Sequence, residues 1–97
     1  MKIKSQNQIN RFLNQQNQNW STDDDGYLKL ELVFKNYIET YGQVSKIALI
    51  SEQLNHHPTM IVDYNKLFIK IKTHSENAIT DKDFEFVEKI NQTLSTS

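Results

Sequence analysis

The spacing of apolar residues changes near position 35, and this change most constrains how the 97-residue chain can fold. From Tyr27 to Phe34, apolar and charged residues alternate, which is the period of a half-buried β-strand. From Lys35 to about Asn55, apolar residues recur every three or four positions, which predicts one long amphipathic helix. We expect Pro58 to end this helix, because proline favours extended backbone angles at the preceding residue. The stripe expected to face the core consists of Tyr37, Ile38, Tyr41, Val44, Ile47, Ala48, Ser51 and Leu54.

Strand and turn signals lie on both sides of this helix. Asp23-Asp24-Asp25-Gly26 predicts a hairpin turn, because the Asp-Gly step tolerates the positive φ angles of a tight turn. After the helix, residues 59–64 and 67–72 alternate again across Asn65-Lys66, which predicts a second hairpin. Thr80 is a suitable N-cap for a final helix. The expected apolar face of that helix consists of Phe84, Val87, Ile90 and Leu94, and the aromatic residues expected in the core are Trp20, Phe34, Tyr64 and Phe84.

Residues 6–19 have an unusual composition, because ten of these fourteen residues are Asn or Gln. Ile9, Phe12 and Leu13 nevertheless keep helical spacing, and Ser5 is a suitable N-cap. The pattern therefore predicts a short helix docked on the domain. The alternative is a polar, partly disordered lead-in over residues 1–19.

Together these patterns predict an α+β fold with the order α-β-β-α-β-β-α, a four-stranded antiparallel sheet with helices on one face. The length predicts a single domain over residues 1–97. The chain has no cysteine, so neither a disulfide framework nor a thiolate metal site is expected. The formal net charge of −1, without a Lys/Arg cluster, argues against nucleic-acid binding. No apolar run approaches membrane-spanning length and Met1 to Asn10 lacks a signal-peptide core, which indicates a cytoplasmic protein without membrane contact.

The three histidines are the candidate chemical groups. If the second hairpin turns at Asn65-Lys66, counting outward along its strands brings His57 opposite His74, with His56 beside them at the helix end. Imidazoles titrate near neutral pH, so such a pair could supply an acid and a base to one substrate. Three imidazoles could instead hold a zinc ion, or the histidines could simply end a helix and occupy a loop.

Seven residues between positions 52 and 83 combine these histidines with two carboxylates. In chain order they are Glu52, His56, His57, Pro58, Tyr64, His74 and Asp83. This set resembles the active-site signature of the pterin-4a-carbinolamine dehydratase family, and a fainter resemblance extends from Trp20 to about Leu94. The chain departs from the family pattern twice: Met60 stands where members often have Trp, and Asn77-Ala78 stands where members often have Gly.

The resemblance implies an enzyme, a 4a-hydroxytetrahydrobiopterin dehydratase of the carbon-oxygen hydro-lyase class. Such an enzyme removes water from 4a-hydroxytetrahydropterin to give quinonoid dihydropterin. It would need neither a cofactor nor a metal, since the reduced pterin is its substrate. The resemblance implies that His56, His57 and His74 are catalytic, and that Glu52, Pro58 and Asp83 bind substrate or support the histidines.

Two carboxylates lie where they could support these imidazoles. Glu52 precedes His56 by one helical turn and could orient its ring. Asp83 follows Thr80 by three positions, so it could cap the last helix or approach His74 across the short loop.

The resemblance also implies partners. Family members form dimers and tetramers, so a homodimer or homotetramer is expected, and an exposed sheet edge offers one place for a second copy. An aromatic amino-acid hydroxylase is the expected functional partner in tetrahydropterin recycling. The alternative function is that of a non-catalytic dimerisation or assembly partner with the same fold.

Overall fold

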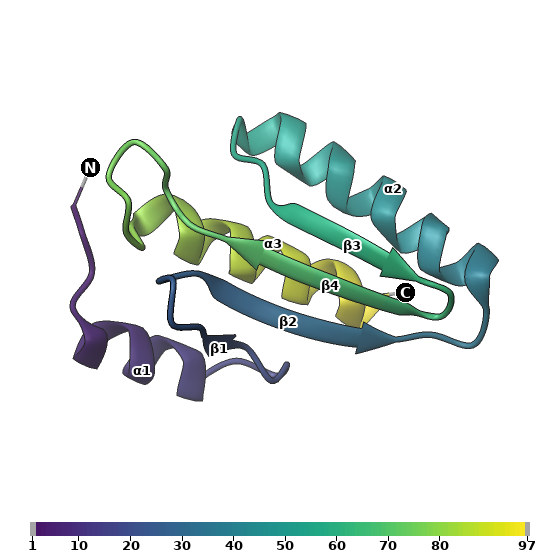
Figure 1. Ribbon diagram of the computed structural model, residues 1–97, viewed down its shortest axis with the longest axis horizontal. Coiled ribbons are helices and arrows are strands. Elements are labelled where there is room, and N and C mark those ends of the chain that lie inside the picture. Colours follow the sequence, from purple (N-terminus) through teal and green to yellow (C-terminus); the bar gives the residue numbers. More distant parts are fainter. Residues whose placement is uncertain (1, 97) are drawn as a thin grey trace.

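The computed structural model describes residues 2–96, with side chains described through Leu94. Within this range the elements are α1 (Gln6–Asn14), β1 (Ser21–Thr22), β2 (Leu28–Val33), α2 (Tyr37–Leu54), β3 (Thr59–Asp63), β4 (Lys66–Ile71) and α3 (Asp81–Thr96). The strands form one antiparallel sheet in the order β1-β2-β4-β3. Figure 1 shows α3 running behind this sheet and α2 lying along its β3 side. The predicted α+β class and element order are confirmed.

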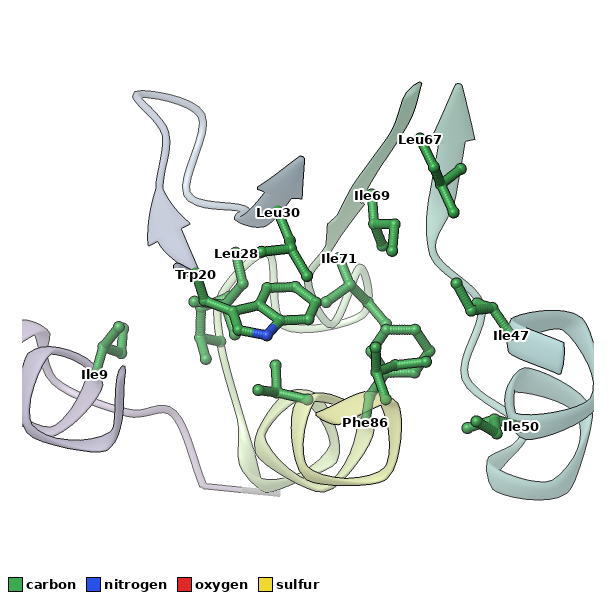
Figure 2. Packing of buried hydrophobic residues seen from close by; sticks show 13 residues of the cluster. Ile9, Trp20, Leu28, Leu30, Ile47, Ile50, Leu67, Ile69, Ile71 and Phe86 are labelled. Atoms are coloured by element: carbon green, nitrogen blue, oxygen red, sulfur yellow. The ribbon is translucent and has the colours of Figure 1, made fainter. Parts of the chain in front are cut away.

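The core lies between one face of the sheet and the two long helices. Alternate residues of β2 and β4 are buried, as the two-residue period of a strand requires. Among them, Leu30 and Ile69 point toward Phe86 of α3 (Figure 2), and Ile47 adds a buried side chain from α2. Burying one such side chain fully is worth about 1.5–3 kcal/mol, so this face of the sheet determines where the helices pack.

The Asn/Gln-rich segment forms the docked helix α1, as predicted. Ser5 accepts a hydrogen bond from the backbone N–H of Gln8, and the Gln8 side chain accepts one from the N–H of Ser5, which completes a capping box. Ile9 is buried, and Phe12 stacks on Phe84 of α3 with ring centroids 3.9 Å apart. Three apolar side chains at helical spacing therefore order α1 despite its polar composition.

Helix α2 begins and ends at asparagine caps. The Asn36 side chain accepts a hydrogen bond from the N–H of Glu39, and Asn55 takes a left-handed conformation with φ of 50° just after the last turn. The helix therefore ends at Leu54, before the residue whose backbone Pro58 restricts. Proline is common shortly after such a cap, because it cannot continue the helix.

The predicted stripe of α2 is partly wrong. Val44, Ile47, Leu54 and the polar Ser51 face the core as expected, but the polar residues Thr40 and Gln43 are also buried. Thr40 and Ser51 donate their hydroxyl hydrogens to carbonyls of the preceding turn, which lowers the cost of burial. The apolar residues that lie instead on the exposed side are Tyr37, Ile38, Tyr41, Ala48 and Leu49.

The second hairpin turns one residue earlier than predicted. Asp63 pairs with Lys66, so Tyr64 and Asn65 occupy the turn, and Tyr64 takes a left-handed φ of 52°. Phe34, just after β2, holds this turn in place. Its N–H donates to the Asn65 carbonyl at 2.8 Å, and the Asn65 side-chain amide donates to the Phe34 carbonyl at 3.2 Å.

Two predictions fail because of this register. Tyr64 is exposed at the turn and not in the core, whereas Trp20 is buried and Phe34 and Phe84 pack against the core as expected. The prediction that His57 lies directly opposite His74 is also wrong. Continued outward from the observed pairs, the register sets His57 across from Lys72.

Residues 73–78, which follow β4, form a tight turn. Thr73 and Ala78 exchange backbone hydrogen bonds of 2.9 and 3.3 Å, and the N–H of Asn77 donates to the carbonyl of His74 at 3.1 Å. Asn77 has a φ of 48°, so this departure from the family's glycine occupies a position where a left-handed residue is required. Its side chain also accepts a hydrogen bond from Lys72 at 2.8 Å.

We predict that Asn77→Ala is less stable than Asn77→Gly by about 0.5–1 kcal/mol. Alanine is strained in the left-handed region, whereas glycine is not. The larger conformational entropy of glycine in the unfolded chain offsets part of this advantage of the glycine variant. Both variants lose the hydrogen bond to Lys72, so the difference isolates the backbone term. Urea unfolding measures it, and Glu76→Ala in the same turn serves as the control, with little expected change. Equal stability of the alanine and glycine variants would contradict a left-handed Asn77.

Candidate functional site

Three chain segments meet at one end of the molecule. They are the C-terminal end of α2, the turn after β4 and the N-terminal end of α3, and Figure 1 shows them on the same side, away from the β3–β4 turn. His56 and His57 follow the first segment, His74 lies in the second and Asp83 in the third. The fold therefore gathers the candidate residues at one end, although not in the predicted pairs.

His56 and Asp83 form a buried pair. The His56 Nε2 lies 2.6 Å from Asp83 Oδ1, and the two side chains are 11% and 0% exposed. Phe86 presents its ring edge-on to the imidazole, with centroids 6.5 Å apart. We expected Asp83 to cap α3 or to approach His74. The histidine it contacts is His56, so the second expectation is wrong.

Asp83 also caps α3, as the sequence indicates. Its Oδ2 accepts a hydrogen bond from the Thr80 N–H at 2.9 Å, and the Thr80 hydroxyl accepts one from the N–H of Lys82 at 3.3 Å. Oδ2 accepts a further hydrogen bond from the Thr73 hydroxyl at 2.8 Å. This contact to Thr73 was not predicted, because it depends on how the turn after β4 packs on α3.

His57 pairs with Glu52 at the surface. The Nε2 of His57 contacts Oε2 of Glu52, and the two side chains are 55% and 76% exposed. The expectation that Glu52 orients His56 is therefore wrong, because its partner is the next residue. The two neighbouring imidazoles thus lie in different surroundings, one buried against Asp83 and one open to solvent.

His74 is an exposed residue of the turn after β4. Its ring meets Tyr27 edge-on at a centroid distance of 6.0 Å. The ammonium groups of Lys70 and Lys72 each lie 4.4 Å from the Tyr27 ring centroid, within the range of a cation–π contact. Tyr27 was not among the predicted site residues. The only signal was an aromatic residue directly after the Asp-Gly turn.

Pro58 and Met60 connect the histidines to the sheet. Pro58 is half-buried between His57 and β3, where it restricts the backbone that follows the two adjacent histidines. Met60 packs partly buried against the core, so this departure from the family's tryptophan lies on the helix-facing side of β3.

Two negative findings apply to residues 2–96. In this range no three His, Asp or Glu side chains are close enough together to hold a metal ion, so the zinc alternative gains no support here. None of the helices formed by the same residues has the length and apolar character needed to cross a membrane.

The arrangement suits proton transfer. The His56 and His57 imidazoles each contact one carboxylate, and His74 lies in a hydrogen-bonded turn at the same end of the molecule. Such a set can place several proton donors and acceptors around one bound molecule.

Known proteins resemble this chain in sequence. Residues 3–93 match the family model described as pterin 4 alpha carbinolamine dehydratase. Proteins named "Putative pterin-4-alpha-carbinolamine dehydratase" from Sulfolobus acidocaldarius and Prochlorococcus marinus strain NATL2A are 39% and 37% identical to this chain. The two alignments cover 90% and 93% of this chain and 93% of each relative.

A solved structure is also similar. It is described as a transcriptional coactivator/pterin dehydratase from Brucella melitensis, and it superposes with a TM-score of 0.87 at 27% identity. The match covers 94% of this chain and 97% of that one. Sequence and fold agree, and the chain belongs to the pterin 4 alpha carbinolamine dehydratase family.

Proposed function

We propose that this protein dehydrates 4a-hydroxytetrahydropterin to quinonoid dihydropterin by histidine general acid/base catalysis. In this reaction N5 loses its proton, a double bond forms between N5 and C4a, and the C4a–O bond breaks. The departing hydroxyl takes up a proton and leaves as water. The step therefore needs one proton acceptor and one proton donor, and no redox cofactor or metal.

One observation carries the proposal: imidazoles from the end of α2 and from the turn after β4 stand at the same end of the molecule, two of them paired with carboxylates. Family membership supports dehydratase activity independently. We assign the acid and base roles to His57 and His74, whose rings are exposed and accessible to a substrate. His56, held by buried Asp83, would contact the substrate beside them, so that its orientation and tautomer also affect the rate.

The proposed setting is tetrahydropterin recycling in the cytoplasm. An aromatic amino-acid hydroxylase would be the functional partner, because hydroxylation with a reduced pterin produces the 4a-hydroxy compound.

We predict that His57→Ala and His74→Ala each lower kcat by about 10²–10⁴-fold, because each removes one partner of the proton transfer. The assay generates 4a-hydroxytetrahydropterin with a hydroxylase and follows the loss of its absorbance above the spontaneous rate. Glu88→Ala, an exposed substitution on α3, is the control and should retain the wild-type rate. Unchanged rates in both histidine variants would exclude this mechanism.

We also propose a homodimer or homotetramer built on the exposed apolar face of α2. Ile38 and Leu49 are 83% and 67% exposed, and Tyr37 and Tyr41 lie on the same side with their rings in edge contact. An exposed apolar patch on a small domain is typical of an interaction surface. A second copy would present the same patch, so a two-fold arrangement can bury both.

We expect Leu49→Glu to shift the wild-type oligomer toward the monomer, because a charge in an apolar interface loses its hydration on assembly. Light scattering after size-exclusion chromatography measures the mass. Lys89→Glu, an exposed charge reversal on α3, should leave the oligomer intact. A monomeric wild-type protein would contradict the proposal.

The same face provides a test of the second candidate function, an assembly partner. The Brucella melitensis relative is described as both a transcriptional coactivator and a pterin dehydratase. A wild-type protein without dehydratase activity that binds a stoichiometric partner, and loses it on Leu49→Glu, would favour this function.

A further inference from the structure

The Thr73 and Thr80 hydroxyls form a buried pair beside the site. Their Oγ1 atoms are 2.7 Å apart, and the two residues are 4% and 0% exposed. Thr73 comes from the segment that leaves β4, whereas Thr80 immediately precedes α3. The pair therefore joins two of the three segments that carry the candidate residues.

The direction of each hydrogen bond in this network follows from counting hydrogens. A threonine hydroxyl has one hydrogen, and Thr73 donates its hydrogen to Asp83 Oδ2 at 2.8 Å. The hydrogen between the two hydroxyls must then come from Thr80. The Thr80 oxygen in turn accepts from the N–H of Lys82 at 3.3 Å. The donors therefore form a chain from the Lys82 N–H through the Thr80 and Thr73 hydroxyls to the buried carboxylate.

Asp83 connects this hydrogen-bond network to His56. Its Oδ2 is occupied by the Thr73 hydroxyl and the Thr80 N–H, which leaves Oδ1 for the imidazole at 2.6 Å. A carboxylate oxygen accepts, so the hydrogen of this bond lies on His56 Nε2. In the neutral ring, Nδ1 is then the unprotonated nitrogen.

We infer that Thr73 is a positioning residue for the dehydratase site, acting through Asp83 on the tautomer and ring orientation of His56. Thr80 completes the network. Because Thr73 directly precedes His74, the same hydroxyl also anchors the backbone that carries the second candidate histidine. The kinetic part of this inference rests on the proposed function, whereas the effect on the His56 tautomer does not.

The decisive comparison is Thr73→Val against Thr73→Ser. Valine keeps the shape of the side chain but removes the hydroxyl, so Asp83 Oδ2 loses one of its two donors. Serine keeps the donor. We expect kcat to fall by about 10–100-fold in Thr73→Val, with KM little changed, by analogy with the loss of a group that orients a metal-bound histidine. Thr73→Ser should restore most of the rate.

Thr40→Val is the matched control. Thr40 is also fully buried, but its hydroxyl donates to the Asn36 carbonyl within α2, away from this network. It removes a buried hydroxyl without touching Asp83, so its kcat should equal the wild-type value even if its thermal stability falls. An equal loss of kcat in Thr40→Val and Thr73→Val would overturn the inference, because general destabilisation would then explain the loss.

A second readout does not depend on activity. Nitrogen NMR of ¹⁵N-histidine-labelled protein distinguishes the two imidazole tautomers, and His56 is assigned by its loss in His56→Gln. At a pH where the ring is neutral, we expect the wild type and Thr73→Ser to show the Nε2–H form of His56, and Thr73→Val to show a mixture. A folded Thr73→Val with the wild-type His56 spectrum and kcat would overturn the inference. Inactivity of the wild type would defeat the proposed function, and the NMR comparison alone would then decide the role of Thr73.

Discussion

The buried carboxylate of Asp83 is the interaction on which the site end of this molecule depends. Removing a carboxylate from water costs on the order of several kcal/mol unless hydrogen bonds replace the lost hydration. Hydrogen-bond donors from three segments offset this cost: the Thr80 N–H at the start of α3, the Thr73 hydroxyl in the turn after β4 and the imidazole that follows α2. These segments must therefore meet in one geometry. The requirement that stabilises the carboxylate is the same one that places His56.

Helix α2 connects this site to the outer surface of the protein. Its inner face buries Ile47 and Ile50 together with the polar residues Thr40 and Ser51, whose hydroxyls are satisfied within the helix. Its outer face exposes apolar side chains that the monomer leaves uncovered. Since Glu52, His56 and His57 lie at or just after the end of this helix, packing along α2 would also influence the site.

Both departures from the family pattern lie where the structure can accommodate them. Asn77 adopts a left-handed conformation that asparagine tolerates better than most residues, and its side chain adds a contact to Lys72. Met60 packs against the core, where a flexible side chain fills space readily. Asn77 contacts His74 only through the backbone, and neither side chain makes a hydrogen bond to an imidazole or to Asp83, so the side-chain contacts of the candidate site do not involve them.

The sequence by itself determined the elements and their order. Local signals suffice for these, because periodicity, caps and turn residues act over a few positions. They identified the strand at Tyr27 to Phe34 and the caps Ser5 and Thr80, whereas the candidate site residues came from the resemblance to the family. Only the tertiary structure decided which partners meet. Asp83 contacts His56, Glu52 contacts His57, and Asn65 lies in the hairpin turn, where it hydrogen-bonds to Phe34. The His56–Asp83 and Phe34–Asn65 contacts join residues 27 and 31 positions apart, and residue spacing alone contains no information about such distances. The Glu52–His57 contact is local, but it depends on how the backbone turns after α2.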